Sequence, residues 1–214
     1  MKQIFYLAVF FTLFAHPFIQ GKEQTTYVYD KEIEGKHSKI TWNLEEKDKD
    51  LEIKGEDDKG ATSITLSDHE AKNFKFEAKD KKNSYSIQKK QGHLVLETAG
   101  SETKGFNIGN SPWVQEFAFS LKPFILSSKK TYSFTIVDPK RLNSHKMVAT
   151  KQYDEKIELN KKEIEAVRVK VTLAGMKKMF WSAALWYDKK TGAMLRYQAN
   201  EGPHTPLTTI TLSS

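Results

Sequence analysis

The chain has 214 residues and no cysteine, and its 34 lysine and arginine residues outnumber 27 aspartate and glutamate residues, for a formal net charge of +7. Without cysteine it can form no disulfide, so the fold depends on its hydrophobic core. Only three of the basic residues are arginine, and the lysines form no stripe, which argues against nucleic-acid binding.

The N-terminus has the layout of a secretory signal peptide. A short basic region precedes a mainly apolar run of 11 residues, from Ile4 to Phe14, and small Gly21 stands at the predicted cleavage point. A membrane-spanning helix needs about 20 apolar residues, so an uncleaved anchor is the alternative rather than the main interpretation. We predict that residues 1–21 are a signal peptide cleaved near Gly21 and that the protein is periplasmic or secreted.

The remaining residues, 22–214, are predicted to form a single domain, long enough to bury a core without disulfides. Many of their lysines occur in pairs at turns, such as Lys81-Lys82 and Lys161-Lys162. Lysines at turns commonly protect sheet edges from pairing with other chains. The alternative is that they contact an anionic membrane surface, because basic residues bind anionic headgroups.

Apolar and polar residues alternate along most of residues 22–214, the pattern of half-buried strands. Ile40, Trp42 and Leu44 are one such set. Charged or glycine-containing turns separate these runs at intervals of about ten residues, which indicates an antiparallel meander. A sheet of this length is expected to curl.

The second half of the chain contains the best-defined strands. Residues 147–160 form either a pair of strands or one bent strand, and residues 163–173 form a long valine-rich strand. Residues 183–197 form a hairpin around the turn Asp188–Gly192. An aspartate can bond the backbone amides of such a turn, and glycine adopts the positive φ at its end.

The alternation breaks at residues 110–124. The sequence Asn-Ser-Pro at 110–112 can cap and begin a helix, and apolar residues recur every fourth position from Trp113 to Leu121. This predicts an amphipathic helix of about 10–12 residues that ends at Pro123. A strand over residues 116–121 is the alternative, because apolar residues also alternate there.

The sequence therefore predicts a mainly β protein: a curled antiparallel sheet, or half-barrel, of about 11–13 strands, with one short helix closing its concave face. The presence of a cavity follows from this architecture and not from any particular residue.

The sequence offers few signs of catalysis or metal binding. The histidines lie far apart, form no metal-ligand motif and have no cysteine to join them. No nucleophile motif is present. We therefore predict no catalytic residue, no metal site and no cofactor.

The aromatic and aliphatic side chains could line a cavity for an apolar ligand. The candidates are Trp42, Phe74, Phe76, Trp113, Phe117, Leu121, Phe134, Val169 and Trp186. Asp188 and Arg196 could orient a polar headgroup at the rim. The alternatives are ordinary core packing for the first set and a surface ion pair for the second.

The order of these segments, together with three stretches of sequence, resembles a known family. The stretches are SPWVQEFA at 111–118, Phe180-Trp181, and the hairpin WYDKKTGAMLRY at 186–197. They resemble uncharacterised domain-of-unknown-function proteins of Gram-negative bacteria, which are similar to the lipoprotein-carrier (LolA/LolB-like) half-barrels. The resemblance implies a periplasmic location, an incomplete barrel with a helix inside and no catalytic residues. Carriers of this shape hold acyl chains in an apolar cavity.

Three functions follow as hypotheses. The first is a non-enzymatic periplasmic binding or carrier protein for a lipid, an acyl chain or another hydrophobic ligand. The second is a cell-envelope scaffold or adaptor with no small ligand. The third is a secreted enzyme whose site is dispersed along the chain, which no motif supports.

Overall fold

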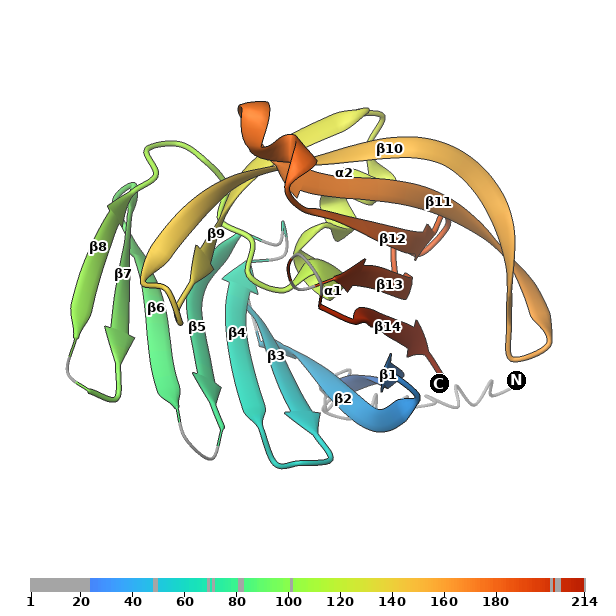
Figure 1. Cartoon of the computed structure of the whole chain (residues 1–214), viewed down its shortest axis with the longest axis horizontal. Coiled ribbons are helices and arrows are strands. Elements are labelled where there is room, and N and C mark those ends of the chain that lie inside the picture. Colours follow the sequence, from blue (N-terminus) through green and yellow to red (C-terminus); the bar gives the residue numbers. More distant parts are fainter. Residues whose placement is uncertain are drawn as a thin grey trace, which may run out of the picture.

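The computed structural model describes residues 24–47, 50–68, 70, 72–80, 83–100, 102–200, 202 and 205–213, and the structural statements below refer to these. The predicted signal peptide lies outside them. Fourteen strands form one antiparallel sheet that is not closed into a barrel (Figure 1). The predicted fold class is confirmed, with slightly more strands than expected.

The sheet consists of two meanders. The N-terminal wing contains β1 (Gln24–Ile33), β2 (Lys36–Lys47), β3 (Asp50–Asp57), β4 (Thr62–Asp68), β5 (Asn73–Lys79), β6 (Ser84–Lys90), β7 (His93–Thr98) and β8 (Thr103–Asn107). The C-terminal wing contains β9 (Thr131–Asp138), β10 (Asn143–Leu159), β11 (Lys162–Leu173), β12 (Ser182–Asp188), β13 (Met194–Asn200) and β14 (Leu207–Leu212). Pairing of β1 with β14 joins the wings, which leaves β8 and β9 as the two edges.

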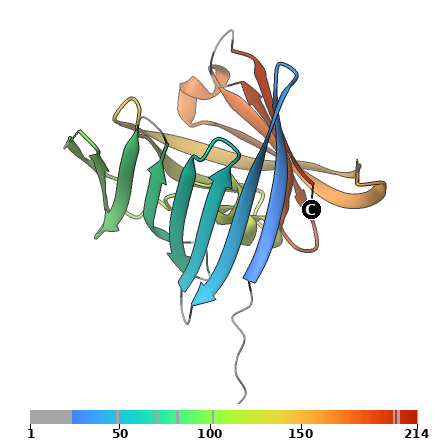
Figure 2. The ribbon, with the colours of Figure 1, turned by 90° about the horizontal axis from the view of Figure 1, so that it is seen from below.

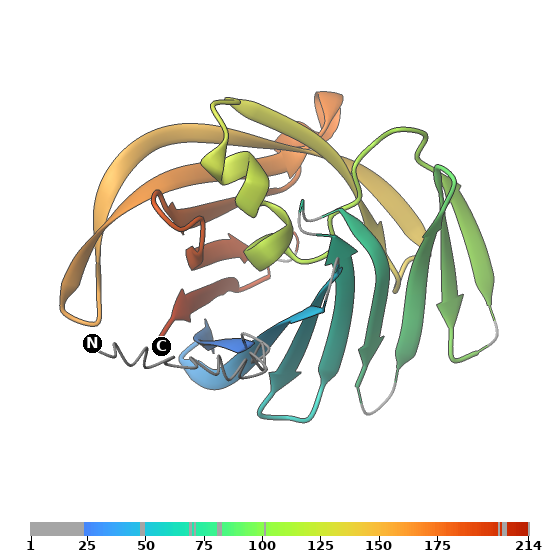
Figure 3. The ribbon, with the colours of Figure 1, turned by 180° about the vertical axis from the view of Figure 1, so that it is seen from behind.

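Two short helices, α1 (Phe117–Ser120) and α2 (Lys122–Leu126), lie in the hollow between the wings. Figure 3 shows them from behind, covering the inner face of the sheet. The prediction of a helix that closes the concave face is confirmed in place but not in extent.

The helix begins later than predicted because residues 112–114 are extended. The Val114 amide donates to the Thr135 carbonyl at 3.0 Å, and the Thr135 amide donates to the Pro112 carbonyl at 2.8 Å. This bridge to β9 withdraws Trp113 from the helix. Pro123 stands in the first turn of α2 instead of ending a helix, a position where the missing N–H costs nothing.

Helices of four and five residues are too short to be stable alone, and both are tied to the C-terminal wing. The Tyr187 hydroxyl donates to the Phe117 carbonyl at 2.9 Å. The Lys151 ammonium donates to the carbonyls of Ile125 and Ser127, at 2.9 and 2.5 Å, where α2 ends. Each contact satisfies carbonyl groups that a helix end would otherwise leave unpaired.

Side chains of the helices also reach the N-terminal wing. The Phe119 ring makes edge contacts with Tyr27 and Trp42, with ring centres 5.8 and 5.4 Å apart. The Ser120 hydroxyl donates to the side chain of buried Asn73 on β5, at 3.2 Å. The helical segment therefore holds both wings.

Two details of the C-terminal wing follow the sequence closely. β10 is one bent strand with an irregularity between Lys151 and Asp154, so the bent-strand alternative holds. In the last hairpin, Asp188 Oδ1 accepts the amides of Lys190 and Thr191 at 2.7 and 2.8 Å, and Gly192 has φ of 72°.

The hydrophobic core has three parts. The main core joins the helices to both wings across the concave face. A second core lies under β5–β8, against Trp113 and Val137. A third lies on the other face of β12 and β13, around Trp186, where residues of the β10–β11 hairpin cover it. Along β12, successive residues from Ala183 to Tyr187 alternate between the main and the third core, as strand geometry requires.

Gly55 gives Trp42 the space to reach Phe119. The two residues are cross-strand partners in β2 and β3. A methyl group on Gly55 would lie 2.6 Å from a ring carbon of Trp42 and 2.7 Å from Ser63 Oγ. Displacement of the ring would disturb its edge contact with Phe119.

We therefore expect Gly55→Ala to lower the free energy of unfolding by about 1–3 kcal/mol, the usual cost of overpacking. Urea unfolding measures this change. Gly105→Ala is the matched control, because Gly105 also lies in a strand but has no atom within 4 Å of an added methyl group. Equal stabilities for the two variants would show that Trp42 does not need this space.

Candidate ligand-binding cleft

A cleft of about 680 Å³ lies between the two wings, beside α1. Its wall on the N-terminal wing comes from the start of β4, the end of β5 and the start of β6. Its wall on the C-terminal wing comes from β9, β10 and the end of β11. The volume is within the range of about 300–1,000 Å³ that is usual for small-molecule sites.

The inner part of the cleft is apolar. The side chains concerned are Tyr85, Phe117, Ile136, Met147, Leu173, Trp181 and Tyr197. Five of them are partly exposed and pack against the main core: Phe117, Ile136, Leu173, Trp181 and Tyr197. The cleft therefore borders the main core. The Trp181 Nε1 donates to the Asn200 carbonyl at 2.8 Å, which fixes this ring. A surface of this kind can accept an apolar group that excludes water.

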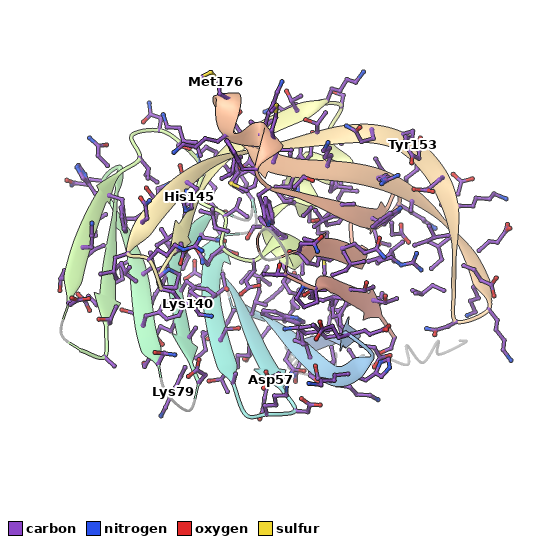
Figure 4. The ribbon with its side chains drawn as sticks, in the orientation of Figure 1. Asp57, Lys79, Lys140, His145, Tyr153 and Met176 are labelled. Carbon is purple, nitrogen blue, oxygen red and sulfur yellow. The ribbon has the colours of Figure 1, made fainter. Side chains whose placement is uncertain are left out.

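Charged side chains also line the cleft: Lys79, Asp80, Asp138, Lys140, Arg141 and His145. Figure 4 labels three of them, Lys79, Lys140 and His145. Asp138 is committed to its own turn, because its Oδ1 accepts the amides of Lys140 and Arg141 at 3.0 and 3.1 Å. Lys79 and Lys140 therefore place cationic groups in the cleft.

Glu116 is an acidic residue that directly precedes the cleft residue Phe117. It directly precedes α1 but does not cap it, and it is only partly accessible. Burial raises the pKa of Glu116 to about 8. Burial also raises the pKa of Tyr85 in the cleft wall to about 12, with smaller contributions from the charges of Glu116, Asp138 and Asp80. With this pKa, the Glu116 carboxyl is mostly protonated at neutral pH in the folded protein.

The structure places one of the nine predicted cavity residues, Phe117, in the lining of the cleft. Phe134 lies directly behind it, with ring centres 6.0 Å apart. The other core residues lie deeper: Trp42, Leu121 and Val169 in the main core, and Phe76 and Trp113 in the second core. These match the alternative of ordinary core packing.

Four further candidates lie elsewhere. Leu66 pairs with Lys75 and Ser67 with Asn73, so Phe74 is the extra residue of a β-bulge and does not line the cleft. Trp186 is in the third core, on the other face of the sheet. Arg196 stacks on that ring at 5.8 Å, and Asp188 caps its turn.

The expected headgroup role of Asp188 and Arg196 therefore has no support in their position. Strand alternation explains the difference for Trp186, because its neighbours Leu185 and Tyr187 take the concave side. The Trp186 ring faces outward, and two cationic side chains cover it there: Arg168, at 5.2 Å, and Arg196.

Several lining residues escaped the sequence analysis, among them Ile136, Met147, Leu173 and Tyr197. Their alternation shows that they face inward, but it does not show which end of each strand stays open. Phe180 and Trp181, which belong to the aromatic residues that the sequence offers for a cavity, do line the cleft.

Among the described residues, no group of three or more histidine, aspartate or glutamate side chains could hold a metal ion. In the same part of the chain, no helix has both the length and the apolar character needed to cross a membrane.

The protein is therefore a half-barrel with a largely apolar cleft between its two wings. A β-barrel-like protein of domain of unknown function DUF1849 from Brucella abortus shares this fold, with a TM-score of 0.64, 10% identity and coverage of 89% of this chain and 95% of that one. The predicted resemblance to an uncharacterised half-barrel family is thus confirmed as a likeness of fold.

Two further solved structures are similar to this chain with lower TM-scores. The hypothetical lipoprotein YmcC from Escherichia coli matches with a TM-score of 0.44 and 14% identity, over 88% of this chain and 83% of that one. A LolA superfamily protein from Nitrosomonas europaea matches with a TM-score of 0.28 and 7% identity, over 92% and 86%. Scores this low support no structural argument. No protein-family model matches the sequence, and no curated protein matches it.

The raised pKa of Glu116 makes stability depend on pH. Its folded-state pKa of about 8 is above the ordinary 4.5, so the folded protein holds this proton over a range in which the unfolded chain has lost it. The free energy of unfolding should therefore fall as pH rises from about 5 to 8. Because the side chain keeps some contact with solvent, we expect a loss on the order of 1–2 kcal/mol.

Urea unfolding of wild type and Glu116→Gln across this range tests the expectation. The variant should match wild type near pH 5 and exceed its stability near about pH 8. Glu97→Gln, which removes an exposed carboxylate, should keep the wild-type slope. A Glu116→Gln slope equal to that of wild type would contradict the prediction.

Proposed function

We propose that the protein is a non-enzymatic carrier or binding protein of the cell envelope, which holds the apolar part of a lipid, an acyl chain or another hydrophobic ligand in the cleft. The observation that carries the proposal is the cleft, which has a volume of about 680 Å³ and an apolar inner lining on the concave face of the half-barrel. The predicted signal peptide supports the envelope location.

The energetics of an acyl chain fit such a site. Burial of apolar surface contributes about 0.8 kcal/mol per methylene, so a chain of about ten methylenes gains about 8 kcal/mol before the costs of association. Those costs are several kcal/mol, which leaves binding reversible. Reversibility is what a carrier requires, since it must release its ligand.

The distribution of polarity also supports an amphipathic ligand. Phe117, Leu173 and Trp181 offer an apolar surface, while Lys79 and Lys140 supply positive charge in the same cleft. A ligand with an apolar chain and an anionic or polar head satisfies both regions at once. A purely apolar ligand would leave the lysines without a role.

Native mass spectrometry of protein purified from its own host, followed by organic extraction, is the direct experiment. Release of a lipid or other apolar molecule on denaturation would support the carrier and name its ligand. An apo mass, together with failure to bind a dansylated fatty acid, would overturn the proposal and favour the envelope scaffold.

A single charge in the cleft should weaken binding. Leu173 lines the cleft and is only partly buried, so we expect Leu173→Asp to fold and to bind dansylated undecanoic acid more weakly by at least about tenfold, because the new carboxylate must be desolvated. Fluorescence titration gives the affinity, and thermal unfolding reports the fold.

Leu51→Asp is the matched control. Leu51 is also a partly buried leucine packed against the main core, but it does not line the cleft. This variant should lose a similar amount of stability and keep its affinity. Equal affinities for the two variants would place the ligand elsewhere.

A further inference from the structure

The connection between β11 and β12 projects from the sheet as a short 3₁₀ helix, η1 (Gly175–Met179). Figure 1 shows it as an orange hook above the sheet, and Figure 4 places Met176 on it. Its base is held at both ends. The Ala174 amide donates to the Lys146 carbonyl at 2.8 Å, and Trp181 is fixed by its bond to Asn200.

This projection exposes its large apolar side chains. Met176 is 91% exposed, Met179 84% and Phe180 72%, the highest values among the exposed large hydrophobic residues of the described chain. Single exposed apolar residues are common, but three within five positions form a patch, and such patches mark interaction surfaces. Their burial against a partner would recover the hydrophobic free energy that exposure forgoes.

The charge of the projection identifies the kind of partner. Exposed Lys177 and Lys178 stand between the two methionines, and η1 itself contains no acidic residue. Lysines can extend their ammonium groups to a polar interface while nearby apolar side chains enter the hydrocarbon. Anionic headgroups then neutralise the lysines. The apolar residues and the lysines together match an anionic lipid surface.

The projection is also continuous with the cleft. Phe180 and Trp181, the residues that follow η1, line the cleft together with Lys140 and Arg141 from the β9–β10 turn. Figure 2 shows the orange η1 and the yellow β9–β10 turn at the same end of the sheet. A surface bound to η1 would therefore lie beside the cleft.

From this geometry we infer that η1 and Phe180 form a docking site for an anionic lipid bilayer, with Met176 and Met179 entering the interface and Lys177 and Lys178 binding headgroups. The inference goes beyond the proposed carrier function and does not need it, because docking depends on the exposed projection and not on the contents of the cleft.

The test uses the exported form of the protein, free of the predicted signal peptide, and liposomes of phosphatidylcholine with or without phosphatidylglycerol. Wild type should cosediment with the anionic liposomes. The variant Met176→Ser/Met179→Ser should lose at least about tenfold in partition coefficient, because two apolar side chains no longer enter the interface. These methionines do not line the cleft, so binding of dansylated undecanoic acid should remain unchanged.

The charge contribution has its own control. Lys177→Gln/Lys178→Gln should bind the anionic liposomes more weakly, by about fivefold per lysine, and the wild-type preference for them should weaken with salt. Lys161→Gln/Lys162→Gln removes another exposed lysine pair, at the opposite end of β11, and should bind like wild type.

Three results would overturn the inference: no cosedimentation of wild type, no loss in the methionine variant, or an equal loss in both lysine variants. Because docking and fatty-acid binding are measured separately, failure of the docking site is distinguishable from failure of the carrier. A wild-type protein that binds fatty acid but no liposome would point to a protein partner for η1.

Discussion

The structure depends on one arrangement: a helical segment of less than three turns is held inside an open sheet by hydrogen bonds from the C-terminal wing. A sheet whose edges β8 and β9 do not pair with each other would expose its apolar concave face. α1 and α2 cover that face, but helices this short do not persist alone. Tyr187 and Lys151 supply the missing hydrogen bonds at their ends.

The same arrangement explains why the molecule has a cleft. Phe119 fills the space against Tyr27 and Trp42, so one part of the concave face is solid core. The helices do not extend far enough to fill the rest, and the side chains of β9, β10 and β11 beyond them line the cleft. Glu116 directly precedes α1, and burial raises the pKa of its carboxyl. The solid core and the cleft are therefore two consequences of one short helical segment.

The fold could be predicted from the sequence, because alternation and turns are local signals. The helix was predicted in the right place, but its start was wrong, because the extended bridge of residues 112–114 to Thr135 depends on a strand about twenty residues further along the chain. The cleft residues were mostly missed for a related reason. Periodicity tells which face Leu173 takes, but only the packing of the helices decides whether that face is filled or open.

The hairpin at 186–197, which carries most of the sequence resemblance, has a structural role at each distinctive position. Trp186 anchors the outer core, Tyr187 holds the helix from the inner side, and Asp188 caps the turn. Arg196 covers the Trp186 ring from the neighbouring strand. This sequence pattern therefore identifies residues that hold the helices inside the half-barrel, and it carries no information about the ligand. Information on the ligand must instead come from the residues that line the cleft and from the η1 projection beside it.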